Sequence, residues 1–291
     1  MTTTRTNQTL QLNDGWRLGY AEYGLPEGKP VIYFHGNPGS RLDGQMLDEA
    51  ALVRLKVRLI APDRPGIGLS DFQPNRTLDD WPRDVVALAD ALGLERFAVM
   101  GLSGGGPYVS VCALKIPERL TAAAIVSGAG PISVPGLTKG MDAGRFYLQG
   151  ARLHPWLAQL FLELMKSGLE ASRHSATPGA PPGMPAADVA ALACPGVSQA
   201  YFAMLEESWR TGTRGVAWDA VILARPWGFR LEEITLPVHL WHGEVDNMVP
   251  VAMGRYVAQA IPKCEAKYYP DEGHVSLLAN HLEEIVNVLA A

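Results

Sequence analysis

The segment Gly101-Leu102-Ser103-Gly104-Gly105 limits what this chain can fold into more than any other, because it joins a predicted strand directly to a predicted helix. The apolar run 97–100 before it is typical of a buried strand, and the stretch 104–115 after it is helix-like. A turn straight from strand into helix is so tight that side chains at the flanking positions would clash, hence the glycines. Such a turn lifts the serine hydroxyl above the sheet, where it can act as a nucleophile. The sequence therefore predicts a nucleophile elbow centred on Ser103.

Short apolar runs without polar alternation indicate strands that are buried on both faces of a parallel sheet. They are residues 31–34, 57–61, 97–100, 122–126, 238–241 and 266–269. An antiparallel hairpin precedes them, since segments 9–12 and 16–23 flank the turn signal Asn13-Asp14-Gly15. Helical segments, at 80–92, 104–115, 251–261 and 276–289, separate the later runs. This alternation predicts an α/β fold with a doubly wound, mostly parallel sheet.

The alternation of strands and helices stops between residues 131 and 231. Trp156, Leu160 and Leu164 belong to an apolar helical stripe, and segments 197–210 and 215–224 also have helical patterns. Between these helices, residues 176–185 are so rich in Pro and Gly that they indicate an exposed loop. We therefore expect an α/β core formed by residues 1–130 and 232–291, with residues 131–231 inserted as a helical cap over the site.

Composition restricts the partners and the compartment. The 291 residues carry a mild net charge of -5 and no Lys/Arg cluster, which argues against a nucleic-acid partner. Three scattered cysteines, Cys112, Cys194 and Cys264, lack the C-x-x-C spacing of a zinc site and the even number of a disulfide framework. A polar N-terminus and the lack of an apolar run of ~20 residues predict neither a signal peptide nor a membrane span. We expect a cytoplasmic protein without cofactor or metal; its oligomeric state is not indicated.

A general base for Ser103 is expected on a loop near the carboxyl edge of the sheet. His274 ends the segment Pro270-Asp-Glu-Gly-His274, just past the last predicted strand, where a loop can bring it over the serine. His35 and His242 also follow strands, but each adjoins a glycine in a strand-exit turn, where packing and hydrogen bonding are the usual roles. We therefore predict His274 as the base.

The acid that orients this histidine is predicted after strand 238–241, where the chain reads His242-Gly-Glu-Val-Asp246. Asp246 is the favoured residue, and Glu244 is its rival, better suited to a structural hydrogen bond. The other place for an acid, after strand 122–126, contains no carboxylate. Ser103, Asp246 and His274 also occur in the chain order of one fold among those that carry such triads.

An oxyanion hole requires two backbone N–H groups aimed at the tetrahedral intermediate. Gly104, directly after the nucleophile, is expected to supply one of them. The second is expected from the loop after strand 31–34, which reads His35-Gly-Asn-Pro-Gly-Ser40. Gly36 permits a bend in this loop and Pro38 restricts the backbone after Asn37, so that the Asn37 N–H can point toward the site.

Together these motifs resemble the α/β-hydrolase superfamily, in the branch that inserts a helical cap after the sixth strand. The resemblance is carried by segments 35–39, 63–71, 101–105, 242–246 and 273–274 and extends over the chain beyond the first eight residues. It implies that segment 63–71, Asp-Arg-Pro-Gly-Ile-Gly-Leu-Ser-Asp, is structural.

The same comparison separates branches of the superfamily. His35-Gly-Asn-Pro38 is similar to the loop of haloalkane dehalogenases, in which the Asn helps to hold the departing halide. Those enzymes and the epoxide hydrolases use an aspartate nucleophile, so Ser103 argues against both activities. The cap also resembles that of proline iminopeptidases, whose elbow and oxyanion loop differ. If this chain acted as such a peptidase, Glu206 and Glu207 could bind a substrate amine, but a solvated helical face explains these two residues better.

We predict a serine hydrolase that cleaves a small or medium apolar carboxylic ester, because the insertion is rich in Trp, Phe, Met and Leu. Trp227 is our candidate pocket residue, and we expect at least one of Trp156, Phe161, Trp209 and Trp227 to select acyl length. Three alternatives remain: a lactonase or a carbon–carbon bond hydrolase with the same triad, or a non-catalytic ligand receptor on the same fold.

Overall fold

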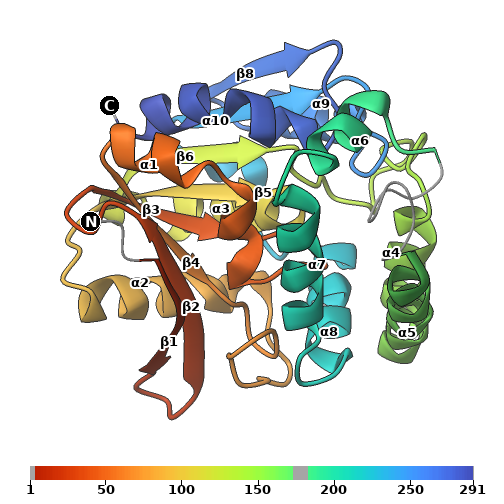
Figure 1. Ribbon diagram of the computed structural model, residues 1–291, viewed down its shortest axis with the longest axis horizontal. Helices are drawn as coiled ribbons and strands as arrows, with labels where there is room; N and C mark the ends of the chain where they lie inside the picture. The colour runs from red at the N-terminus through yellow and green to blue at the C-terminus, as the bar shows by residue number, and fades with distance from the viewer. Residues whose placement is uncertain (1–3, 173–182, 291) are drawn as a thin grey trace.

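The computed structural model describes residues 4–172 and 183–290 (Figure 1). Within them, eight strands form one sheet in the order β1-β2-β4-β3-β5-β6-β7-β8. The strands are β1 (Arg5–Gln11), β2 (Arg17–Gly24), β3 (Lys29–Phe34), β4 (Val57–Pro62), β5 (Phe97–Leu102), β6 (Leu120–Val126), β7 (Val238–Gly243) and β8 (Cys264–Tyr269). β1 and β2 pair antiparallel, as do β2 and β4, and the remaining pairs are parallel. The predicted mostly parallel, doubly wound sheet is confirmed.

The strand order reverses beside β3, and this reversal locates the site. From β3 the chain crosses outward to β4 and then returns on the other side of β3 to form β5. Phe34 at the end of β3 therefore pairs with Gly101 near the end of β5. In open α/β sheets, ligands bind outside the carboxyl ends of the strands where the order reverses. The loops after β3 and β5 are those that the sequence analysis predicts to carry Asn37 and Ser103.

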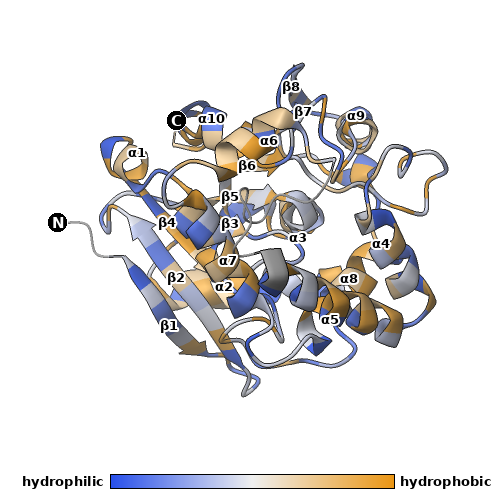
Figure 2. Ribbon diagram, turned by 45° about the vertical axis from the view of Figure 1, so that its right-hand side comes forward, coloured by the Kyte–Doolittle hydropathy of each residue, from blue (hydrophilic) through white to orange (hydrophobic). Residues whose placement is uncertain are grey.

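Helices cover both faces of the sheet. Successive side chains of the central strands point to opposite sides, so apolar side chains on both faces need covering. Ile32 and Phe34 pack in one core with helices α2 (Trp81–Ala91), α3 (Gly106–Lys115) and α9 (Val251–Ala260). Val31 and Tyr33 pack in another with α1 (Glu49–Arg54) and α10 (Ser276–Leu289). At the edge, β1 is partly exposed along its length, and Figure 2 shows hydrophilic residues on it. The sheet is thus a two-sided scaffold with buried central strands.

Between β6 and β7, the described residues contain five α-helices, which we call the cap helices. They are α4 (Gly144–Leu153), α5 (Pro155–Ser172), α6 (Ala186–Leu192), α7 (Val197–Ser208) and α8 (Arg214–Ala224). Figure 1 shows α4 and α5 at the far side of the molecule from β1 and β2. Helices α4, α5 and α8 pack together in one core, which Ile67 also joins. The patterns at 156–165, 197–210 and 215–224 correspond to α5, α7 and α8, whereas α4 and α6 were not predicted. The core boundaries at 130 and 232 stay a prediction, and most of the predicted loop 176–185 lies outside the described residues.

Two further features concern the whole described chain. Among the described residues, no helix is both long enough and apolar enough to cross a lipid bilayer. Cys112, Cys194 and Cys264 are free thiols, and Cys112 is buried within α3.

Candidate active site

The turn around Ser103 has the geometry that the flanking glycines predict. β5 ends at Leu102, and the short 3-10 helix Ser103–Gly105 leads directly into α3. Ser103 has a φ of 57°, in the left-handed region that side chains rarely adopt. A Cβ on Gly101 would overlap the carbonyl oxygen of Gly105, and one on Gly105 would overlap that of Phe34. Glycine is therefore required on both sides of this strained serine.

His274 and Asp246 form a buried hydrogen-bonded pair. The imidazole Nδ1–H donates to Asp246 Oδ2 at 2.8 Å, and the backbone N–H groups of Met248 and Val249 donate to Oδ1 at 2.9 and 2.8 Å. Because an ionised carboxylate only accepts hydrogen bonds, the Nδ1 of His274 must carry the proton. The Nε2 lone pair is left to accept a proton from another group.

The surroundings of His274 favour its protonated form. Burial lowers the pKa of this ring, but the charge and hydrogen bond of Asp246 outweigh burial, so that the pKa is raised above its usual value. Asp188 and Asp142 contribute further negative charge in the same direction. His242 lies 3.6 Å from Asp246, and burial lowers its pKa. The carboxylate of Asp246 therefore raises the pKa of His274 above its usual value, whereas at His242 the effect of burial is the larger one.

The rival residues from the sequence analysis have other partners. Glu244 pairs with Arg255 at the surface. His35 is buried, its Nδ1–H donates to Gly36 O at 2.8 Å, and its Nε2 accepts from Arg64 N at 3.2 Å. Both ring nitrogens of His35 thus hold the loop together. The structure brings Asp246, and not Glu244, to His274.

A cavity that is open to solvent has both Ser103 and His274 in its wall. Four methionines give the wall an apolar and adaptable character: Met46, Met165, Met204 and Met248. Among the described residues, no hydrogen bond joins Ser103 Oγ to His274. Such bonds are often long in unliganded sites and tighten when substrate binds.

The loop after β3 meets the turn after Ser103 at this cavity. A Cβ on Gly36 would lie 3.4 Å from Ser103 Cβ, and one on Gly104 would lie 3.2 Å from the backbone nitrogen of Asn37. The backbone of Asn37 and the backbone of Gly104 are thus neighbours beside the serine. This is the arrangement in which both N–H groups could reach one oxyanion.

Asp43 fixes this loop, and the sequence analysis missed it. Its carboxylate accepts from the N–H groups of Gly36 at 3.3 Å and Ser40 at 3.2 Å, and from Tyr33 Oη–H at 3.3 Å. Burial raises the pKa of Asp43 to about 6, against the lowering effect of those hydrogen bonds. The signal was available, because Ser40 and Asp43 have the spacing of a capping box.

The Asn37 side chain forms its hydrogen bonds with the cap helices. Its Nδ2 donates to Asp219 Oδ2 at 2.6 Å and to Val216 O at 3.1 Å, and its Oδ1 accepts from Tyr147 Oη–H at 2.9 Å. Asp219 is itself buried and held by Arg64 through bonds of 2.9 and 2.7 Å. With both amide N–H groups used, the halide-holding role implied by similarity to dehalogenases is not supported.

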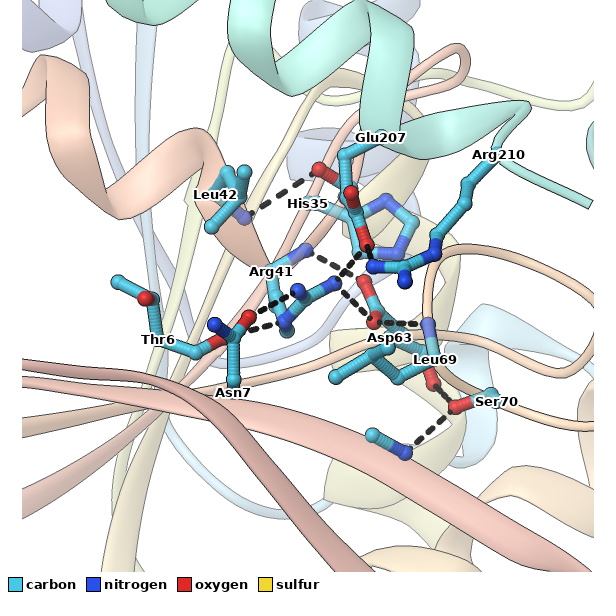
Figure 3. Close-up of polar contacts among 12 residues, drawn as sticks. Thr6, Asn7, His35, Arg41, Leu42, Asp63, Leu69, Ser70, Glu207 and Arg210 are labelled. Carbon is cyan, nitrogen blue, oxygen red and sulfur yellow. Dashed lines mark hydrogen bonds and ion pairs between the residues drawn. The ribbon is translucent and has the colours of Figure 1, made fainter.

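A second cap contact involves the buried guanidinium of Arg41 (Figure 3). Its Nη1 lies 2.9 Å from Asp63 Oδ2 and 2.6 Å from Glu207 Oε1, and its backbone N–H donates to Asp63 Oδ1 at 2.7 Å. Asp63 also accepts from the Leu69 N–H at 2.9 Å, consistent with a structural role of segment 63–71. The expectation of a solvated face at Glu207 is wrong, and this carboxylate is not free to bind a substrate amine.

The prediction that Trp227 is a pocket residue needs correction, because this side chain lies outside the wall of the cavity beside Ser103. Its indole packs into the core beneath the sheet, stacks on Phe229 with ring centroids 5.9 Å apart, and donates to Leu223 O at 3.3 Å. The chain has already left α8 and turned toward the core at this point, which carries the ring away from the serine.

The other three aromatics also lie outside the cavity wall. Trp156 is exposed, Phe161 stacks on Tyr147, and Trp209 packs in a small cluster with Leu205. The cap residues that do line the cavity are Met165 on α5 and Val197, Tyr201, Met204 and Leu205 on α7. The spacing of the four on α7 is that of one helical face, a signal that could have identified them.

No group of three or more His, Cys, Asp or Glu side chains among the described residues is arranged to bind a metal ion.

Known proteins resemble this chain over nearly its whole length. A non-heme chloroperoxidase from Streptomyces lividans is 29% identical over 289 residues, which is 94% of this chain and 95% of that protein. A 2-hydroxymuconate semialdehyde hydrolase from Pseudomonas putida is 23% identical over 265 residues, 89% of this chain and 85% of the relative. The structure of an esterase from Rhodococcus sp. ECU1013 superposes with a TM-score of 0.66 at 25% identity and covers 97% of both chains. The alpha/beta hydrolase fold family matches residues 29–280, and the chain is therefore a hydrolase that belongs to this family.

Proposed function

We propose that this protein hydrolyses small or medium apolar carboxylic esters through an acyl-enzyme on Ser103. One observation carries the proposal: the Asp246–His274 hydrogen bond leaves Nε2 of His274 as a proton acceptor in the cavity that also contains Ser103. A strained serine beside an oriented imidazole is the arrangement that activates a hydroxyl nucleophile.

The proposed reaction assigns a group of this site to each step. Ser103 Oγ attacks the acyl carbon while His274 Nε2 accepts its proton, and Asp246 stabilises the resulting imidazolium. The N–H groups of Gly104 and Asn37 donate to the oxyanion. His274 then gives its proton to the leaving alcohol, and afterwards takes one from the water that releases the acid.

The cavity wall suggests the substrate class. Its side chains are mostly apolar, and the four methionines can adjust to acyl or alcohol groups of different shape. Among the described residues, this wall contains no Lys or Arg side chain that could pair with an anionic substrate. A neutral, apolar ester is therefore the substrate that fits best.

The direct test combines covalent labelling with a substrate panel. We expect a fluorophosphonate probe to label Ser103 and p-nitrophenyl esters from acetate to octanoate to be hydrolysed. Lactones and β-diketones in the same panel would reveal the alternative activities. Labelling without turnover of any of these compounds would favour a ligand receptor over an enzyme.

The face of α7 that lines the cavity is expected to set acyl length. Met204→Ala should change the octanoate-to-acetate ratio of kcat/KM by roughly tenfold in favour of the longer ester, because it lengthens the cavity. Trp156→Ala is the matched control on an exposed cap position and should leave the ratio unchanged. Val197→Ala serves as a second variant if Met204→Ala does not fold. An unchanged ratio in folded lining variants would remove α7 as a determinant.

The pH dependence follows from the charges around His274. The base must be neutral to accept a proton, so kcat/KM should fall as the pH decreases through the pKa of His274. Because Asp246 holds that pKa above the usual value of about 6.5, the midpoint of this acid limb should lie above 6.5. Initial rates with p-nitrophenyl acetate between pH 5 and 9 measure it. A midpoint below 6.5 would mean that burial outweighs the carboxylate.

A further inference from the structure

Asp188, on the cap helix α6, is fully buried and bonded to the loop that carries His274. Its Oδ2 accepts from the backbone N–H of His274 at 2.9 Å, and its Oδ1 accepts from Val275 and Ser276 at 2.9 and 2.8 Å. No motif of the sequence analysis includes this residue. One carboxylate of the cap helices thus binds three successive N–H groups of the core.

The packing around these bonds leaves Asp188 little freedom. A Cβ on Gly273 would overlap the Asp188 carboxylate, so the carboxylate lies directly against the glycine backbone. Ser276 begins α10, and the first N–H groups of a helix have no partners within it. A negative charge at this position also suits the positive end of the helix dipole. The bonds to Asp188 therefore fix the direction in which the chain enters α10.

His274 is consequently held from two sides. Asp246 on the core side binds the imidazole Nδ1, while Asp188 on the cap side binds the main-chain N–H of the same residue. Helix α6 packs against α10, as Figure 1 shows. We propose that Asp188 is a positioning residue of the reaction: it ties the docking of the cap helices to the alignment of His274 with Ser103. This rests on the proposed function only in taking His274 as the base.

A purely structural helix cap is the competing explanation, and it predicts an unchanged kcat in folded variants of Asp188. The negative charge of Asp188 is one of the influences that raise the pKa of His274, after that of Asp246. The other charged groups that act on the ring include Asp142, which raises its pKa as well, while His242 also lies near this pair and has its own pKa lowered by burial and, to a smaller extent, by the charge of His274. A change at Asp188 should therefore alter both the orientation and the titration of His274.

The test replaces Asp188 with asparagine, which keeps the size but removes the charge and turns an NH₂ group toward backbone donors. We expect kcat to fall by roughly 10²-fold with KM little changed, because a misplacement of about 1 Å of the base suffices for such a loss. The imidazole of His274, followed by NMR, should titrate at lower pH than in the wild type. Asp142→Asn is the matched control: it removes a charge near the ring without touching the main chain of His274, so the titration should shift without the loss in kcat.

A second variant approaches the same contact from the other side. Gly273→Ala adds a methyl group against the carboxylate and should lower kcat with Asp188 still present. Wild-type kcat in folded Asp188→Asn or Gly273→Ala would overturn the proposal, as would an equal loss in Asp142→Asn. The NMR titration needs no substrate. An unshifted His274 in Asp188→Asn would therefore count against this proposal even if the wild type hydrolysed no ester, which would overturn only the proposed function.

Discussion

Replacement of Ser103 with alanine is expected to lower kcat for ester hydrolysis by up to about 10⁶-fold, because no other group in the cavity can form the acyl-enzyme. The backbone at this position has a φ of 57°, which alanine tolerates no worse than serine, so the fold should be retained. Initial rates with p-nitrophenyl acetate measure the loss, and circular dichroism verifies the fold. Reaction with a fluorophosphonate should disappear in parallel.

Ser167→Ala is the matched control for this prediction. Ser167 lies on the exposed face of α5 and donates to Glu163 O at 3.1 Å within its own helix. Its replacement should leave turnover and labelling at wild-type levels. If Ser103→Ala, free of contaminating esterase, kept more than a small fraction of the wild-type rate, the acyl-enzyme mechanism would be wrong.

The sheet and the elbow could be predicted because their signals are local. Strands buried on both faces are short apolar runs, and the glycines around Ser103 mark a close backbone approach that no other residue allows. Asp246 and His274 each follow a predicted strand, and the carboxyl ends of neighbouring parallel strands meet at one edge. The positions of Asp246 and His274 after these strands were therefore enough to predict that the two side chains lie close together.

The contacts between the cap helices and the core could not be predicted, because their partners are distant in the sequence. Asp188 is separated by 86 residues from His274, and Asp219 by 155 from Arg64. A single acid on a short helix has no local signature of such a role. Trp227 was misplaced for a related reason: an apolar side chain near the end of an insertion fits a core as well as a cavity, and only the path of the chain decides between them.

Asp246→Asn is expected to fold normally yet lose roughly 10²–10⁴-fold in kcat. The backbone N–H groups of Met248 and Val249 fix an oxygen at the Oδ1 position, which places the new NH₂ group against His274. That NH₂ group donates to Nδ1, so the imidazole must carry its proton on Nε2 and cannot accept one from Ser103. The amide also fails to stabilise the imidazolium. Steady-state kinetics with p-nitrophenyl acetate measure the loss.

Glu244→Gln is the comparison that tests the choice of acid. Glu244 lies two residues earlier, but its carboxylate pairs with Arg255 at the surface, where an ion pair contributes little to stability. The kcat of Glu244→Gln should therefore stay near that of the wild type. The acid limb of the pH profile should also stay in place for Glu244→Gln and move to lower pH for any residual activity of Asp246→Asn, because Asp246 contributes most to raising the pKa of His274 and Glu244 is not among the groups that raise it. If Glu244→Gln lost more activity than Asp246→Asn, or moved the limb instead, the acid would be Glu244, and the hydrogen bond between Asp246 and His274 would have only a structural role.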